Sequence, residues 1–305
     1  MPCFSPLTAW YGAERSPSSG KRPIVFHRAL SFSGVKLCLP CGQCVGCRLE
    51  RSRQWAVRCM HEKRMCVDSA FVTLTYADEN LPVGGSLVKR DLQLFMKRLR
   101  KRFGSGIRFY GCGEYGGQFD RPHYHVLLFN FRVTDGVPVA RAKGGQTLYS
   151  SEEIAELWRV GHHWIGEVNF DSCAYVARYI LKKVTGSPAE AHYQVVTVEG
   201  EIVDREPEFT VMSRRPGIGS QWFDRYHVEC YNWDSVIMNA QEARPPRYYD
   251  NRFDLIDTVR LEALKVKRRR AAMLHRADNT TRRLRVREVV TLRRLALFQR
   301  RELYV

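Results

Sequence analysis

The chain has 305 residues, with 49 Lys and Arg against 32 Asp and Glu, which gives a formal net charge of +17 at pH 7. Hydrophobic residues make up 44% of it, enough for a folded core, so a mainly disordered chain is excluded. The apolar runs are far shorter than the roughly 18–20 residues of a membrane span, and no signal peptide or membrane attachment is expected. The positive charge favours a polyanionic partner, most simply nucleic acid, with acidic proteins and lipid headgroups as alternatives.

Residues 1–47 are predicted to be irregular, and cysteines recur at every third position in CLPCGQCVGC, residues 38–47. Two-residue spacers let neighbouring thiolates converge on one ion, and without a secretory route metal binding is favoured over disulfides. Zn²⁺ is expected, because Cys₄ structural sites are typically zinc sites. The ligands would be Cys41, Cys44 and Cys47, with either Cys3 or Cys38 as the fourth; the alternative is a set of reduced, buried thiols.

The remaining cysteines lie in patterned segments and are expected in the core. They are Cys59, Cys66, Cys112, Cys173 and Cys230.

Regular elements are predicted from residue 48 onward. Residues 48–66 have the pattern of a basic helix, and Phe71–Tyr76 that of a buried strand. An amphipathic helix is expected to begin with Ser86 as its cap and to end at Gly104. Strands follow at 107–114, 123–129 and 162–170. Helices are expected from the capping box of Ser150 and Glu153 to about 161, and from 171 or 172 to about 184. The order predicts an α+β fold with helices on one face of a sheet.

The C-terminal third differs in composition from the segments before it. Residues 190–245 contain short strand-like pieces, and the chain becomes helical and basic from about residue 254. Residues 244–305 hold 18 Lys and Arg against 7 Asp and Glu, so this segment carries +11 of the total of +17. We therefore expect four parts: a Cys-rich segment with its basic helix (1–66), a sheet domain (67–190), accessory strands and loop (191–245) and a basic helical tail (246–305).

Two histidines occupy alternate positions in the apolar strand RPHYHVLLF. The side chains of His123 and His125 point to the same face, with Cα atoms roughly 6.5–7 Å apart, so both can bind one cation. Glu114, at the end of the preceding strand, is the expected third ligand, with Gln118 and Asp120 as alternatives. Two imidazoles and a carboxylate leave coordination positions open for a substrate. The alternative is a pair of structural histidines.

Two tyrosines lie one helical turn apart in DSCAYVARYILKKV. Tyr175, Tyr179 and Lys182 share one face of the predicted helix, and the apolar stripe lies on the opposite side. A phenol can act as a covalent nucleophile toward phosphate, and Lys182 and Arg178 are suited to neutralise phosphate charge. The alternative is a pair of amphipathic surface tyrosines.

These motifs, in this order, resemble those of the HUH endonuclease superfamily, and more closely the replication initiation proteins of microviruses, in the two-tyrosine branch. The resemblance covers about residues 1–225. It rests on MPC at the start, PCGQCVGCRLERSRQWAVR (40–58), GEYG (113–116), RPHYHVLLF (121–129), YVARYILKK (175–183) and MSRRPGIG (212–219).

The resemblance implies an antiparallel HUH-type, ferredoxin-like sheet and a site-specific nickase for rolling-circle replication. The histidines and Glu114 would hold Mg²⁺ or Mn²⁺. Tyr175 or Tyr179 would attack the scissile phosphate, leaving a 5′-phosphotyrosine and a 3′-OH primer, and the ends would later be rejoined.

Further expectations follow from the same resemblance and from the charge. The partners would be single-stranded and origin DNA with a host helicase and DNA polymerase, and the location the host bacterial cytoplasm. Residues expected to contact DNA are Arg121, Arg178, Lys183, Arg214 and Arg215. Exposed bases could stack on Tyr110, Tyr115 or Phe119, although aromatic residues at sheet positions are mostly core.

Two other classes of protein remain open from the sequence. One is a non-catalytic zinc-containing DNA-binding protein, which leaves the tyrosine pair without a role. The other is a His-x-His metal-dependent oxygenase, which lacks the expected Glu shortly after the second histidine.

Overall fold

The computed structural model describes residues 3–17, 20–117, 120–141, 145–178, 183–184, 186–197 and 199–304, with side chains to residue 297. The chain divides into two compact units, one of residues 52–261 and one of residues 1–51 with 262–305. The boundaries fall within the helices α1 (Val45–Arg64) and α8 (Thr258–Met273). Each unit is described by itself.

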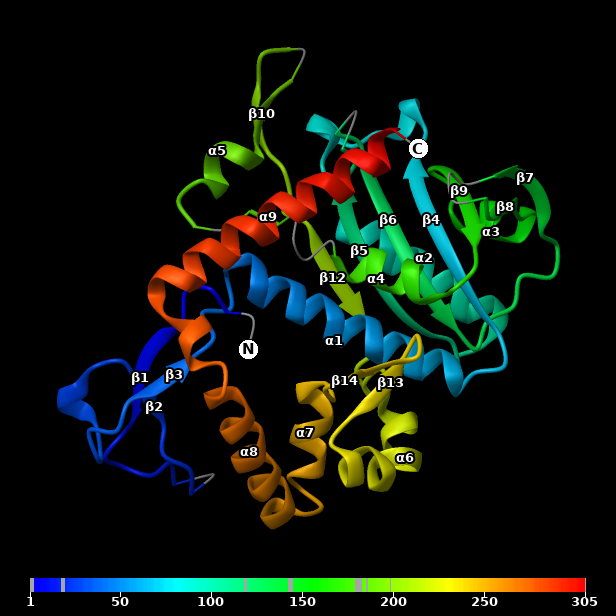
Figure 1. Ribbon diagram of the computed structural model, residues 1–305. Coiled ribbons are helices and arrows are strands. Elements are labelled where there is room, and N and C mark those ends of the chain that lie inside the picture. Colours follow the sequence, from blue (N-terminus) through cyan, green and yellow to red (C-terminus); the bar gives the residue numbers. More distant parts are fainter. Residues whose placement is uncertain are drawn as a thin grey trace. The chain divides into compact units, whose positions relative to one another are not determined.

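Unit 52–261 is built on a sheet that, within the described residues, has seven strands in the order β12-β5-β6-β4-β9-β8-β7. Every neighbouring pair is antiparallel (Figure 1). The strands are β4 (Ser69–Tyr76), β5 (Arg108–Tyr115), β6 (Pro122–Phe129), β7 (Val137–Arg141), β8 (Thr147–Ser150), β9 (Gly161–Gly166) and β12 (Phe209–Met212).

One face of the sheet packs against α2 (Lys89–Phe103) and α3 (Glu152–Leu157). The apolar stripe of α2 is buried against strand residues such as Val72 and Val126, as its helical spacing predicts. Gly104 ends α2 with a φ of 102°, a value that a residue with a side chain rarely adopts.

The second face is also covered by helices, here α1 and α4 (Phe170–Arg178), so that α2 and α4 lie on opposite sides of the sheet in Figure 1. Cys59 of α1 and Val176 of α4 are buried with Tyr110 and Leu127 of the sheet. The expected α+β class with an antiparallel sheet is confirmed, but helices cover both faces rather than one. The reason is that β5 and β6 are apolar on both sides, which requires cover on both.

Of the cysteines expected in the core, four are buried and Cys66 is half-buried; the buried ones are Cys59, Cys112, Cys173 and Cys230.

Residues 186–257 add smaller elements to this unit. The short strands expected between residues 190 and 245 are present, but α6 lies among them and was not predicted. Aromatic residues, which favour helices weakly, make up much of α6, so its sequence resembles that of a strand. The elements are α5 (Ala189–Tyr193), β10 (Gln194–Val196), β11 (Ile202–Asp204), α6 (Ser220–Trp233), β13 (Val236–Met238), β14 (Gln241–Ala243) and α7 (Arg247–Phe253).

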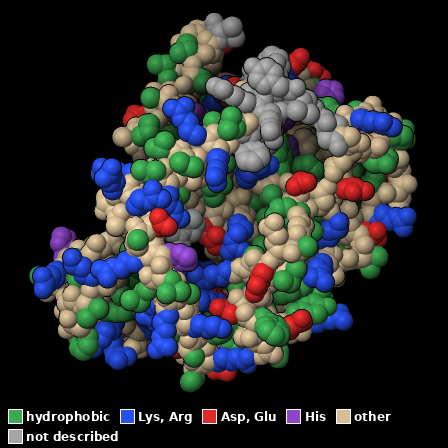
Figure 2. Space-filling view, in the orientation of Figure 1, with side chains coloured by type: hydrophobic (Ala, Val, Ile, Leu, Met, Phe, Trp, Pro, Cys, Tyr) green, Lys and Arg blue, Asp and Glu red, His purple; other side chains and the backbone are tan. Residues whose placement is uncertain are grey.

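The other unit contains a small sheet and basic helices. The sheet has the order β2-β1-β3, formed by β1 (Leu7–Tyr11), β2 (Ile24–Val25) and β3 (Leu37–Leu39). The tail is helical as predicted, in α8 and α9 (Thr281–Tyr304). Lys and Arg side chains are dense where α8 lies in Figure 2. Short 3-10 turns complete the described chain at Arg28–Leu30, Asp78–Asn80, Val83–Gly85 and Arg276–Asn279.

A search of the described helices finds none that is long and apolar enough to cross a membrane.

A buried ion pair joins α1 to the sheet and to the turn before α6. The carboxylate of Glu62 accepts hydrogen bonds from the Arg108 side chain of β5 and from the backbone N–H of Gly219, the latter at 2.6 Å. Arg108 also donates to the carbonyl of Pro216 at 2.9 Å. The two charged groups therefore compensate each other in a place with little access to water.

We expect Glu62→Ala to lower the free energy of unfolding by about 3–5 kcal/mol, because it leaves Arg108 buried without its counter-charge. Urea unfolding followed by circular dichroism measures the change. The control is Glu156→Ala, which removes an exposed partner of Arg102 and should cost no more than about 1 kcal/mol. Equal losses in the two variants would contradict the prediction.

Candidate functional site

The two histidines of β6 lie on the face of the sheet that α1 and α4 partly cover. Residues directly opposite each other in neighbouring antiparallel strands point to the same face. His123 is opposite Glu114 of β5 and Thr75 of β4, and His125 is opposite Thr73 of β4. One face therefore carries both imidazoles, a carboxylate and two hydroxyls.

His125 is held from both sides of its ring. Its Nε2 lies 3.0 Å from Oε1 of Glu114, and its Nδ1 lies 3.0 Å from the hydroxyl of Thr73. Only 5% of His125 and 3% of Glu114 are exposed. Thr73, which the sequence analysis did not single out, therefore orients a site histidine. The alternation of FVTLTY places Thr73 on this face only once the register against β6 is known.

His123 is half-buried and turned toward the backbone. Its Nδ1 lies 2.6 Å from the carbonyl oxygen of Arg121, an atom that can only accept, so Nδ1 carries the hydrogen. Burial lowers the pKa of His123, which favours the neutral ring. In the neutral ring Nε2 then has a free lone pair, as a metal ligand requires.

These residues fit a divalent cation in their chemistry. They offer two imidazole nitrogens and a carboxylate, and the buried hydroxyl of Thr75, opposite His123, has no hydrogen-bond partner in the described structure. The ring centroids of the two histidines are 6.4 Å apart. The ligand atoms of this group are not all within 4.8 Å of one another. Among the described His, Cys, Asp and Glu residues, one group meets that spacing, and it consists of four cysteines.

Tyr175 of α4 lies directly against this site. Its ring meets the His125 ring edge-on, with centroids 5.2 Å apart, and also contacts Phe71. Tyr175 is half-buried rather than on an open face, because α4 buries Cys173 and Val176 beside it. The predicted residues Tyr179 and Lys182 lie outside the described residues.

The alternative third ligands are placed differently from Glu114. Asp120 is exposed, and its carboxylate pairs with Arg205. Gln118 lies outside the described residues. Glu114 is thus the described acidic candidate that contacts a site histidine, although its direct cross-strand partner is His123 and its carboxylate reaches diagonally to His125.

The basic residues expected to contact DNA differ in their exposure and in their partners. Arg121 pairs with Asp78 at 2.5 Å and donates to the carbonyl of Tyr76 at 2.7 Å. Arg178 is half-buried at the described end of α4. The exposed ones are Lys183, Arg214 and Arg215.

The aromatic residues considered for base stacking are core residues where they are described. Tyr110 and Tyr115 are both buried, Tyr110 beneath Trp55 of α1. Phe119 lies outside the described residues.

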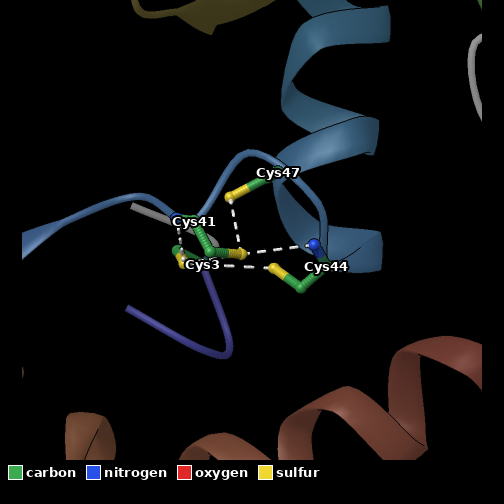
Figure 3. A group of neighbouring side chains, drawn as sticks. All are labelled: Cys3, Cys41, Cys44 and Cys47. Carbon is green, nitrogen blue, oxygen red and sulfur yellow. Dashed lines mark hydrogen bonds between the residues drawn. The ribbon is translucent and has the colours of Figure 1, made fainter. Parts of the chain in front are cut away.

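Four cysteines of the other unit converge at the start of α1 (Figure 3). The sulfur of Cys3 lies 3.7 Å from that of Cys41 and 3.9 Å from that of Cys44, and the sulfurs of Cys41 and Cys47 are 4.0 Å apart. A tetrahedral zinc site with Zn–S bonds of about 2.3 Å has sulfurs about 3.8 Å apart. The cluster therefore has the dimensions of a zinc site, and the fourth member is Cys3, whereas Cys38 is exposed on β3.

Backbone N–H groups point at these sulfurs. The N–H of Phe4 lies 3.3 Å from the sulfur of Cys44, and that of Cys41 lies 3.3 Å from the sulfur of Cys3. Burial raises the pKa of Cys44, but hydrogen bonds from the N–H groups of Phe4 and Cys47, together with those of the Cys41 and Cys47 side chains, outweigh burial and lower the pKa to about 7. Burial raises the pKa of Cys3 and Cys47 in the same cluster. The N–H donors stabilise the thiolate form that binds metal.

The family model and the similar proteins that match this chain all carry the description replication-associated protein. Residues 69–184 match the family model described as replication-associated protein ORF2/G2P. The chain is 33% identical over 261 residues to the replication-associated protein VP4 of Bdellovibrio phage phiMH2K, covering 82% of this chain and 76% of that protein. It is 34% identical over 249 residues to the replication-associated protein ORF2 of Spiroplasma virus 4, covering 77% and 74%.

A third relative is the replication-associated protein ORF4 of Chlamydia phage 1, 31% identical over 234 residues, which cover 73% of this chain and 55% of that protein. No solved structure matches the chain. The relatives confirm the resemblance that the motifs indicated, and this chain belongs to the family of phage replication-associated proteins.

Proposed function

We propose that this chain is a replication initiator that nicks unpaired origin DNA through a tyrosine phenol and later rejoins the ends. The observation that carries the proposal is the double contact of His125, whose Nε2 faces the Glu114 carboxylate and whose ring meets the Tyr175 ring edge-on. A candidate ligand set and a candidate nucleophile thus meet at one imidazole. Membership of the replication-associated family supports the same role.

His123, His125 and Glu114 would hold Mg²⁺ or Mn²⁺ in this proposal. The bound ion would polarise the scissile phosphate and stabilise charge on the leaving oxygen. The protein's part is to keep both rings oriented, through the Arg121 carbonyl and the Thr73 hydroxyl.

In the nicking step the phenol oxygen of a tyrosine attacks the phosphorus and loses its proton to solvent. The bond from phosphorus to the 3′-oxygen breaks, and that oxygen takes up a proton to become a free 3′-OH. The 5′ side stays attached as a phosphotyrosine, and attack by a 3′-OH reverses the step. Tyr175 and Tyr179 are the proposed nucleophiles, with Lys182 as the phosphate partner.

DNA binding would depend on dispersed basic groups and on the tail. Lys and Arg contacts to phosphates give affinity that is strong at low salt and independent of sequence. The proposed contacts at the core are Arg121, Arg178, Lys183, Arg214 and Arg215. The 3′-OH would prime a host DNA polymerase, with a host helicase, in the host bacterial cytoplasm.

The four-cysteine cluster is proposed to hold one structural Zn²⁺. Its sulfur spacing and its N–H donors support this assignment.

We expect the full chain with Mn²⁺ to cleave end-labelled single-stranded oligonucleotides from a phage origin and to remain attached to the 5′ side. The double variant Tyr175→Phe/Tyr179→Phe should abolish the adduct and keep DNA binding, because only the phenol oxygens are lost. Denaturing gels measure the adduct and filter binding the affinity.

Tyr149→Phe, which changes an exposed tyrosine of β8, is the matched control and should cleave like wild type. If the double variant still forms the adduct, the tyrosine mechanism is wrong. If wild type forms none with any tested origin, the non-catalytic DNA-binding function is favoured instead.

Glu114→Gln should weaken Mn²⁺ binding at least about ten-fold, because an amide keeps the shape of the side chain but removes its charge. Titration calorimetry with Mn²⁺ alone measures this. Asp120→Asn removes a nearby exposed charge and should leave the affinity unchanged; the opposite pattern would make Asp120 the ligand.

Protein purified without chelator should contain one zinc ion per chain. Inductively coupled plasma mass spectrometry measures the metal content. Cys41→Ser should lose the ion, whereas Cys38→Ser should keep it, because Cys38 lies outside the cluster. Retention of zinc by the Cys41 variant would refute the assignment.

A further inference from the structure

The face that carries the histidines continues onto β9. Trp164 is opposite Thr73, which on its other side is opposite His125. In the same way His162 is opposite Thr75, which is opposite His123. Trp164 and His162 therefore lie on the same face as the two site histidines and in the same cross-strand rows. Two interstrand spacings separate β9 from β6, about 10 Å.

Trp164 and His162 differ in exposure from the other residues of β9. Trp164 is 36% exposed and His162 is exposed, whereas His163 and Ile165 between and beyond them are buried on the α3 side. Tyr110, on the same face but on β5, is covered by Trp55 of α1. The β9 end of the face thus presents an accessible indole beside the candidate site, and the β5 end does not.

A single exposed apolar side chain needs no explanation in general. What matters for Trp164 is its place, in one row with His125 and two strands from it. Exposed aromatic rings bind unpaired bases by stacking, with little regard to base identity, because every base has a π face.

We propose that Trp164, with His162 beside it, is a nucleobase platform for the single-stranded DNA that flanks the scissile phosphate. This inference rests on the proposed nicking function and specifies its substrate subsite. A separation of about 10 Å corresponds to about three steps at the 3.4 Å rise of stacked DNA and to fewer in an extended strand, so the stacked base lies within about three nucleotides of the nick.

Stacking of a flanking base is the same before and during the nicking step, so it contributes to KM and not to kcat. Loss of one stacked base weakens binding roughly 5- to 150-fold. Trp164→Ala should therefore raise KM for a short single-stranded substrate at least about five-fold and leave kcat within about two-fold. Trp164→Phe, which keeps an aromatic ring, should have a KM close to that of wild type.

The decisive experiment combines this variant with substrates that lack one base. Abasic oligonucleotides, one for each position beside the nick, are cleaved by wild type and by Trp164→Ala under steady-state conditions with Mn²⁺. Wild type should show a raised KM at one position within about three nucleotides, and that penalty should disappear in the variant. Trp233→Ala, which removes a 76% exposed indole of α6, is the matched control and should behave as wild type.

The outcomes separate this inference from the function on which it rests. If wild type does not cleave, the proposed function fails and the platform with it. If wild type cleaves but Trp164→Ala keeps the wild-type KM, lowers kcat alone, or keeps the abasic penalty, only the platform is overturned. If Trp164→Ala fails to fold by circular dichroism, Trp164→Thr, a strand-favouring residue without a ring, takes its place.

Discussion

The register of β6 against β4 and β5 determines whether the ligands of the candidate metal site lie on one face of the sheet. The ligands and supports of the candidate site come from β4, β5 and β6, and a slip of one residue would turn His125 to the opposite face. Tyr124 opposes such a slip, since it points the other way and is buried. Its hydroxyl contacts that of Tyr76 at 2.8 Å and accepts from the N–H of Val88 at 2.8 Å, where α2 begins. The apolar face thus fixes the register that the polar face needs.

Local patterns predicted the elements well where one strong signal dominates, as in β4, β6 and the end of α2 at Gly104. The caps were less predictable. Ser86 does not cap α2 but accepts from the N–H of Glu206, a residue remote in sequence. Ser151, not Ser150, caps α3. At α3 two adjacent serines offered the same local chemistry, and at α2 the N-cap position is taken by Val88, which has no capping side chain. Contacts distant in sequence, with Asp135 at Ser151 and with Glu206 at Ser86, were not visible in either local pattern.

The site follows the same division. Hairpin adjacency predicted that Glu114 would lie beside the histidines, and it does. The sequence could not tell which aromatic side chains stay accessible, because Tyr110 and Trp164 occupy equivalent positions in the alternation of their strands. Their exposure depends on which strands α1 and α4 cover, a property of the packed unit and not of any local pattern.

The cysteine cluster has a consequence for chain entropy. Few apolar side chains of β1–β3 and their connections are buried; Leu7, Phe26 and Phe32, for example, are exposed, so hydrophobic burial contributes little there. A cation held by Cys3 and Cys41 would close a loop of 38 residues around these strands. In the chain-entropy model of a cross-link, closing such a loop lowers the conformational entropy of the unfolded chain and so destabilises the unfolded state by about 4 kcal/mol. The folding of this segment would then depend on bound metal, whereas the sheet of residues 52–261 would keep its own core in the absence of the metal.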